Sequence, residues 1–300
     1  MGEVIRTEGL TKYYGRSRGV VDLDLAVRPG EVFGFLGPNG AGKTTTIRLL
    51  LDFIRPTRGR AEVLGMDARR RSVEIRRRVG YLPGELALYE NLTGHELLTY
   101  LDNLRGRADH GHAKSLAERL DLDLSRHIRA LSKGNKQKLG VVQALMHRPE
   151  LLIMDEPTGG LDPLVQREFN RMVREATSDG ATLFLSSHVL SEVEHLADRV
   201  GIVRQGRLVV VEEVGALKAR AVRRLELDFA RPVPPGAFDS LPGVRDLAVD
   251  GAVVRCAVEG SVDALVKAAA RYEVLNLVSH EPDLEEIFLA YFREDEPDAA

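Results

Sequence analysis

Residues 37–45 have the residue types and the spacing of a phosphate-binding loop. Gly37, Gly42, Lys43 and Thr44 fit the pattern G-x-x-x-x-G-K-[ST]. Glycine lets backbone N–H groups turn toward an anion without a Cβ in the way, and a helix N-terminus adds partial positive charge. Lys43 would reach the β- and γ-phosphates of a nucleotide, and the Thr44 hydroxyl would hold Mg²⁺. The alternative is a glycine-rich turn with a chance lysine. We expect the nucleotide to be bound by Gly37, Pro38, Asn39, Gly40, Ala41, Gly42, Lys43, Thr44 and Thr45.

Two adjacent carboxylates follow an apolar run at residues 151–154. The length of that run predicts a parallel strand buried on both faces, and residues at the carboxyl end of such a strand face the ligand crevice. We expect Asp155 to bind Mg²⁺ and Glu156 to orient or deprotonate the attacking water. The alternative is a surface pair of acids.

His188 follows a predicted strand at residues 182–187, so it would lie at the same edge of the sheet. A neutral imidazole there would hydrogen-bond the γ-phosphate or the attacking water. The alternative is a histidine that caps a helix or packs in the core.

Two other charged features point to simpler interpretations. Arginine triplets at 69–71 and 76–78 would suit a nucleic acid or a lipid headgroup, but the net charge of −3 favours a solvated helix face. His110 and His112 have no further metal ligands nearby in the sequence, which favours a polar loop between helices over a metal pair.

The elements that position these residues predict an α/β core. A short apolar strand at 32–36 precedes the glycine loop, and a helix follows Lys43. Strands and helices then alternate around the loop, as in α/β proteins. Residues 85–130 interrupt this order with two amphipathic helices, the first opened by a capping box at Thr93 and Glu96, and predict an inserted helical subdomain.

The composition changes near residue 220. Alternating strands, a loop rich in proline and a helix predict a separate small α+β domain over residues 220–293, including a helix face formed by Leu284, Ile287, Phe288 and Tyr291. The acidic tail at 294–300 is expected to be disordered. No signal segment opens the chain, no run of about 18 apolar residues occurs, and the single cysteine cannot form an intrachain disulfide.

Residues 131–137, Leu-Ser-Lys-Gly-Asn-Lys-Gln, resemble the signature motif of ATP-binding cassette (ABC) proteins. The resemblance covers roughly residues 3–215. It implies a P-loop ABC ATPase core over residues 1–215, with an N-terminal antiparallel β subdomain and the helical insertion at 85–130. It also implies that Tyr14 stacks on adenine, that Asp162 belongs to the D-loop, and that His188 is the switch histidine.

The resemblance further implies a head-to-tail dimer. ATP on one subunit would be covered by Ser132 and Gly134 of the other, and these residues precede a predicted helix whose N–H groups would face the γ-phosphate. The chain departs from the family pattern at Lys133 and Asn135 in the signature motif and at Gly159 in the D-loop. It also has Gly84 where the family has the Q-loop glutamine, so either Glu85 or water takes that place at Mg²⁺.

The function that the resemblance implies is that of the nucleotide-binding subunit of an exporter. It would bind ATP and Mg²⁺, hydrolyse ATP as a homodimer or as a pseudo-dimer with a paralogous ATPase, and drive a polytopic transmembrane permease from the cytoplasmic face of the cell membrane. No nucleic acid is expected as a partner. The alternative is a soluble ABC ATPase that acts on the ribosome or on nucleic acid. The sequence does not reveal the transported substrate.

Overall fold

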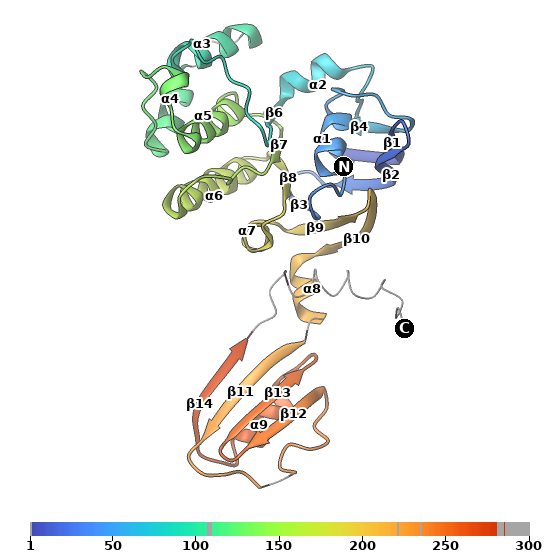
Figure 1. Ribbon diagram of the computed structural model, residues 1–300, viewed down its shortest axis with the longest axis vertical. Coiled ribbons are helices and arrows are strands. Elements are labelled where there is room, and N and C mark those ends of the chain that lie inside the picture. The colour runs from blue at the N-terminus through green and yellow to red at the C-terminus, as the bar shows by residue number, and fades with distance from the viewer. Residues whose placement is uncertain (1, 107–109, 221, 235, 281–284, 286–300) are drawn as a thin grey trace. The chain divides into compact units, whose positions relative to one another are not determined.

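The computed structural model describes residues 2–106, 110–220, 222–234, 236–280 and 285. The chain divides into two compact units, Met1–Val211 and Glu212–Ala300, which are described here separately. Figure 1 shows the elements of each unit. Among the described residues, no helix combines the length and the apolar composition needed to cross a bilayer.

The first unit contains an antiparallel sheet with the strand order β2-β1-β4-β5. Its strands are β1 (Ile5–Tyr14), β2 (Ser17–Val27), β4 (Arg58–Val63) and β5 (Met66–Asp67). β1 pairs antiparallel with both β2 and β4. Along β2, buried residues alternate with exposed ones, as the alternation of polar and apolar side chains predicts. The expected N-terminal antiparallel subdomain is therefore confirmed.

A second sheet in the same unit has the order β10-β9-β3-β8-β7-β6. Its strands are β3 (Val32–Leu36), β6 (Val79–Leu82), β7 (Leu151–Asp155), β8 (Thr182–Ser187), β9 (Arg199–Arg204) and β10 (Arg207–Glu213). β3 lies between β8 and β9, and β7 lies between β6 and β8, all in parallel pairs. All residues of β3, β7 and β8 are buried, as expected for parallel strands covered on both faces.

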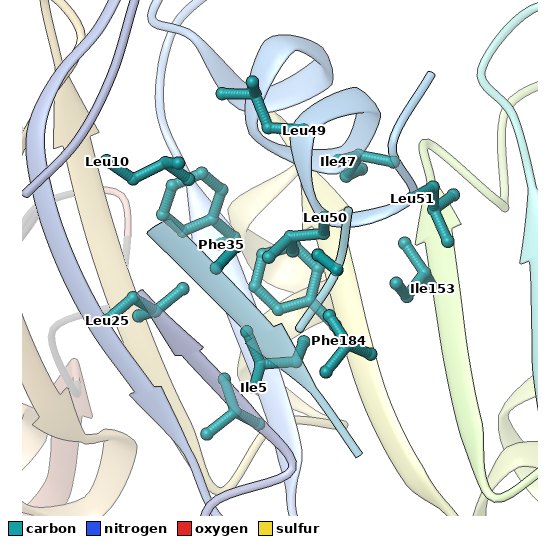
Figure 2. Packing of buried hydrophobic residues seen from close by; sticks show 14 of the residues in the cluster. Ile5, Leu10, Leu25, Phe35, Ile47, Leu49, Leu50, Leu51, Ile153 and Phe184 are labelled. Carbon is teal, nitrogen blue, oxygen red and sulfur yellow. The ribbon is translucent and has the colours of Figure 1, made fainter. Parts of the chain in front are cut away.

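One apolar core joins the two sheets through helix α1 (Lys43–Leu50). Figure 2 shows Leu49 and Leu50 of α1 among side chains of both sheets, including Ile5 of β1 and Phe184 of β8. The rings of Phe35 and Phe184 lie 5.3 Å apart. Because α1 is packed on both sides, the loop that precedes it is held in a fixed position relative to the ends of β7 and β8.

The helical insertion contains α3 (Gly94–Arg105), α4 (His110–Arg119) and a short 3-10 helix (Ile128–Ala130), followed by α5 (Lys133–Leu145). The predicted capping box is confirmed, since Thr93 Oγ1 accepts from Glu96 N and the Glu96 carboxylate accepts from Thr93 N. One expectation is wrong. His110 and His112 lie in the first turn of α4 rather than in a loop between helices.

Three further helices belong to this unit: α2 (Ser72–Arg78), α6 (Pro163–Ser178) and α7 (Leu190–Glu194). A turn precedes α2. The arginine triplet at 76–78 ends α2, but the triplet at 69–71 lies in the turn and not on a helix. The reason is local. Asp67 Oδ1 accepts hydrogen bonds from the backbone N–H groups of Arg69 and Arg70, which holds the chain in a turn.

The first helix of the second unit is α8 (Val214–Arg220), and the unit contains an antiparallel sheet in the order β12-β13-β11-β14. Its strands are β11 (Arg223–Phe229), β12 (Val244–Asp250), β13 (Val253–Val258) and β14 (Val274–His280), and α9 (Asp263–Ala269) follows β13. Phe229, Phe238 and Leu265 are buried in its own core. The predicted helix face at Leu284, Ile287, Phe288 and Tyr291 and the tail at 294–300 lie outside the described residues.

Candidate functional site: a phosphate loop with a carboxylate pair

The phosphate loop connects β3 to α1, and two of its glycines cannot be replaced. Gly42 has φ 109°, and a Cβ there would lie 2.6 Å from the carbonyl oxygen of Gly19. At Gly37, a Cβ would lie 2.4 Å from the carbonyl oxygen of Val203. Both glycines are therefore needed because other backbone segments approach the loop this closely.

The Lys43 side chain folds back over its own loop. Its Nζ donates to the carbonyl oxygens of Gly37 at 2.6 Å and Pro38 at 3.3 Å. Burial lowers the pKa of Lys43, while the negative charges of Glu156 and Asp155 oppose that shift. An arriving phosphate would offer this buried ammonium a stronger partner than two neutral carbonyl oxygens.

Asp155 lies at the end of β7 and joins two hydroxyl groups. Thr44 Oγ1 donates to Asp155 Oδ2 at 2.7 Å, and Ser186 Oγ of β8 donates to Asp155 Oδ1 at 2.7 Å. Asp155 is only 3 % exposed. A hydroxyl and a carboxylate are the hard oxygen donors that Mg²⁺ prefers, so this pair of side chains fits the ion.

Glu156 is the second carboxylate of the site, and it contacts His188. His188 Nδ1 lies 2.8 Å from Glu156 Oε2, and Lys43 Nζ lies 3.9 Å from Glu156 Oε1. Glu156 has a left-handed φ of 51°, which is rare for a residue other than glycine and occurs often at functional sites. A carboxylate oriented by a histidine, next to the phosphate loop, has the geometry of a general base for an attacking water.

A cavity of about 510 Å³ lies over the loop. Of the predicted site residues, its lining includes Tyr14, Pro38, Asn39, Gly40, Gly42, Lys43, Thr44, Thr45, Asp155 and Glu156. Tyr14 is half-exposed, as a ring that stacks on a base would be, and Lys12 Nζ lies 5.3 Å from its centre. Gly37 and Ala41 are buried and do not line the cavity. The lining also contains Gly84 and Glu85.

Four predicted site residues outside the phosphate loop also lie outside the lining of this cavity: His188, Ser132, Gly134 and Asp162. Ser132 caps α5 by accepting a hydrogen bond from Asn135 N. Gly134 therefore lies in the first turn of that helix, whereas we expected it in a turn before the helix. Asp162 caps α6 by accepting from the N–H groups of Leu164 and Val165.

Sequence reasoning missed several residues that shape the site. Ser186 holds Asp155, Gln137 Nε2 donates to the carbonyl oxygen of Pro157 at 2.8 Å, and Arg18, Arg48 and Tyr81 line the cavity. Burial, with the Asp155 charge, raises the pKa of Tyr81 to about 12. Ser186 was detectable by the edge argument that identified Asp155, because it is the last residue but one of the neighbouring strand β8.

The fold and the site define a P-loop nucleoside triphosphate hydrolase. A family model described as "ABC transporter" matches residues 20–159. The chain is 40 % identical over 233 residues to the bacitracin transport ATP-binding protein BcrA of Bacillus licheniformis, a match that covers 77 % of this chain and 76 % of the relative. It is 37 % identical over 300 residues to the daunorubicin resistance ATP-binding protein DrrA3 of Streptomyces coeruleorubidus, covering 95 % and 94 %.

Solved structures agree with this result. The ATP-binding subunit of an ABC transporter superposes with a TM-score of 0.67 at 30 % identity, covering 72 % of this chain and 92 % of that one. A dimeric ATP-binding cassette in a post-hydrolysis state, bound to ADP and Pi, gives 0.65 at 20 % identity, covering 70 % and 98 %, and supports the fold. This chain therefore belongs to the ABC transporter family. It is an ATP-binding subunit of that family and an ATPase.

Proposed function

We propose that the chain energises an exporter of antibiotic-like compounds. The observation that carries the proposal is similarity along nearly the whole length, second unit included, to two resistance proteins. One is DrrA3; the other is the linearmycin resistance ATP-binding protein LnrL of Bacillus subtilis (strain 168), 32 % identical over 303 residues that cover 95 % of this chain and 97 % of the relative. The compound would be bound by a separate polytopic permease, and this chain would work at the cytoplasmic face of the membrane.

The catalytic site would be shared by two subunits. Tyr14 would stack on adenine, and the loop with Lys43 would hold the phosphates. Thr44 Oγ1 and Asp155 Oδ2 already lie 2.7 Å apart and would hold Mg²⁺, while Glu156, oriented by His188, would accept the proton of the attacking water. Mg²⁺ would neutralise charge that develops on the phosphates.

The second subunit would supply what the cavity of one chain lacks. Ser132 and Gly134 lie at the N-terminal end of α5, a helix of 13 residues, and outside the cavity of their own chain. In a head-to-tail dimer these N–H groups would cover the γ-phosphate of the other subunit. ATP would favour the closed dimer, hydrolysis would open it, and the permease would follow through its different contacts with the two states. The partner subunit would be a second copy of this chain; a paralogous ATPase is the alternative.

Co-purification tests this proposal. The full chain carries an affinity tag and is isolated from detergent-solubilised membranes of its own host. A polytopic membrane protein in stoichiometric amount, whose presence raises the rate of phosphate release, is the expected result. Stoichiometric ribosomes or nucleic acid, with no membrane protein, would favour the soluble cassette ATPase instead.

A further inference from the structure

The loop after β6 brings a carboxylate to the metal side of the cavity. Gly84 and Glu85 both line the cavity together with Thr44 and Asp155. Among the described residues, Glu85 has no hydrogen bond or ion pair. Glu85 is exposed, so its carboxylate is accessible to a ligand that enters the cavity.

The backbone at Gly84 passes directly beside Asp155. A Cβ built on Gly84 would lie 3.4 Å from Asp155 Oδ2 and 3.5 Å from its Cγ, and Gly84 has no left-handed φ. Neither space nor backbone conformation therefore requires glycine here. The loop passes Asp155 at residue 84 without a side chain, and the next residue, Glu85, carries a carboxylate and lines the same cavity.

Asp155 leaves room for a further donor. Its Oδ1 already accepts from Ser186, so Oδ2 and the Thr44 hydroxyl, which contact each other, are the two oxygens that would hold Mg²⁺. Mg²⁺ takes six oxygen ligands, and two protein oxygens leave four to phosphate and water. A second carboxylate would bind the ion or one of its waters, and outer partners of this kind change metal affinity strongly.

The charges of the cavity lining support the same assignment. Three cationic and three anionic side chains line it, namely Arg18, Lys43 and Arg48 against Glu85, Asp155 and Glu156. Without Glu85, the lining would have one excess positive charge. The negative charge of Glu85 would repel metal-free ATP, whereas it would attract the Mg²⁺ ion of the metal complex.

We propose that Glu85 acts on Mg²⁺ in place of the absent Q-loop glutamine and makes nucleotide binding depend on the metal more strongly than a neutral amide would. This inference rests on the proposed Mg²⁺·ATP site. It predicts opposite effects on the two forms of the nucleotide, since Glu85 repels the metal-free triphosphate and attracts the metal complex.

The test measures how much Mg²⁺ strengthens the binding of AMP-PNP, a non-hydrolysable ATP analogue, by calorimetric titration of the full chain with and without the metal. In Glu85→Gln, metal-free AMP-PNP should bind more tightly than to the wild type and Mg²⁺·AMP-PNP more weakly. The strengthening by Mg²⁺ should fall about tenfold, and further in Glu85→Ala. Adding Gly84→Gln to Glu85→Ala should restore part of the strengthening by Mg²⁺, because a side chain at residue 84 has room beside Asp155.

The matched control is Glu90→Gln. Glu90 lies in the same segment but pairs with Lys136 at 2.9 Å and does not line the cavity, so its loss changes the net charge equally. The inference would be overturned if Mg²⁺ strengthened AMP-PNP binding in both Glu85 variants as much as in the wild type. It would also be overturned if Glu90→Gln reduced this strengthening as much as Glu85→Gln does. If wild-type binding were itself independent of Mg²⁺, the proposed metal site would fail instead.

Discussion

Replacing Ser186 tests how strongly its hydrogen bond stabilises Asp155 and, through Asp155, the metal site. Its Oγ donates to Asp155 Oδ1 at 2.7 Å, and both side chains are buried, Ser186 at 0 % exposure and Asp155 at 3 %. A hydrogen bond to a charged group contributes about 1.5–3 kcal/mol, and removing the donor leaves a buried carboxylate oxygen without its partner. We therefore expect Ser186→Ala to lower the free energy of unfolding of the first unit by about 2 kcal/mol.

The same substitution should weaken the metal. Asp155 would lose the contact that fixes its orientation toward Thr44, and loss of such an outer partner lowers metal affinity about 10- to 100-fold. The strengthening of AMP-PNP binding by Mg²⁺ should fall accordingly. If Ser186 had only a structural role, its replacement would lower stability but would leave the ratio of AMP-PNP affinities with and without Mg²⁺ unaltered.

Urea denaturation followed by circular dichroism measures the first effect, since the chain has no tryptophan to report it by fluorescence. The control is Ser178→Ala. Its hydroxyl donates to the carbonyl oxygen of Arg174 at 2.8 Å in an exposed position, so its loss should cost less than about 0.5 kcal/mol. If Ser186→Ala were as mild as Ser178→Ala and left the Mg²⁺ dependence intact, the reasoning about Asp155 would be refuted.

Three further predictions follow from individual contacts. His188→Ala removes the contact to Glu156 at 2.8 Å, so phosphate release should slow about 100-fold while AMP-PNP affinity changes little; an unaltered rate would show that the histidine does not orient the base. Gly134→Ala places a Cβ 2.8 Å from a backbone carbonyl oxygen and should lower thermal stability, whereas Gly215→Ala, with no atom within 4 Å, should not. Since the pKa of Tyr81 is raised to about 12, mainly by burial, the unfolded tyrosine loses its proton near pH 10 and the folded one keeps it. Stability should therefore fall as pH rises from 10 through 12, and less steeply in Tyr81→Phe; equal slopes would contradict this.

Much of the core was predictable because its strands are uninterrupted apolar runs. The predicted strands 32–36 and 182–187 coincide with β3 and β8, and the buried parallel strand before Asp155 is β7. In an α/β sheet, chemistry gathers at the carboxyl ends of such strands. This rule was sufficient to identify Asp155 and Glu156.

Hydrogen bonds between side chains and backbone explain what the sequence did not reveal. Ser132 starts α5 early by capping it, which places Gly134 inside a helix despite its low helix propensity. Asp67 holds the first arginine triplet in a turn. Such bonds decide where elements begin, and periodicity does not detect them.

Contacts between distant residues were equally hidden. The sequence predicts that Glu156 and His188 share a sheet edge, but only the structure gives their distance of 2.8 Å. The sheet-edge argument also places Ser186 near Asp155, but a small polar residue within an apolar run does not reveal which group its hydroxyl contacts. The structure alone shows that its hydroxyl reaches Asp155.

The central claim is that two of these chains complete one another's ATP sites, with Glu156 as the base. The most direct measurement is the mass of Glu156→Gln in solution by light scattering, with and without Mg²⁺·ATP. The chain has a mass of 33.1 kDa. The account predicts that this variant does not release phosphate and has twice that mass only when ATP is bound. A variant that binds ATP at the mass of one chain, or hydrolyses it at the wild-type rate, would contradict the claim.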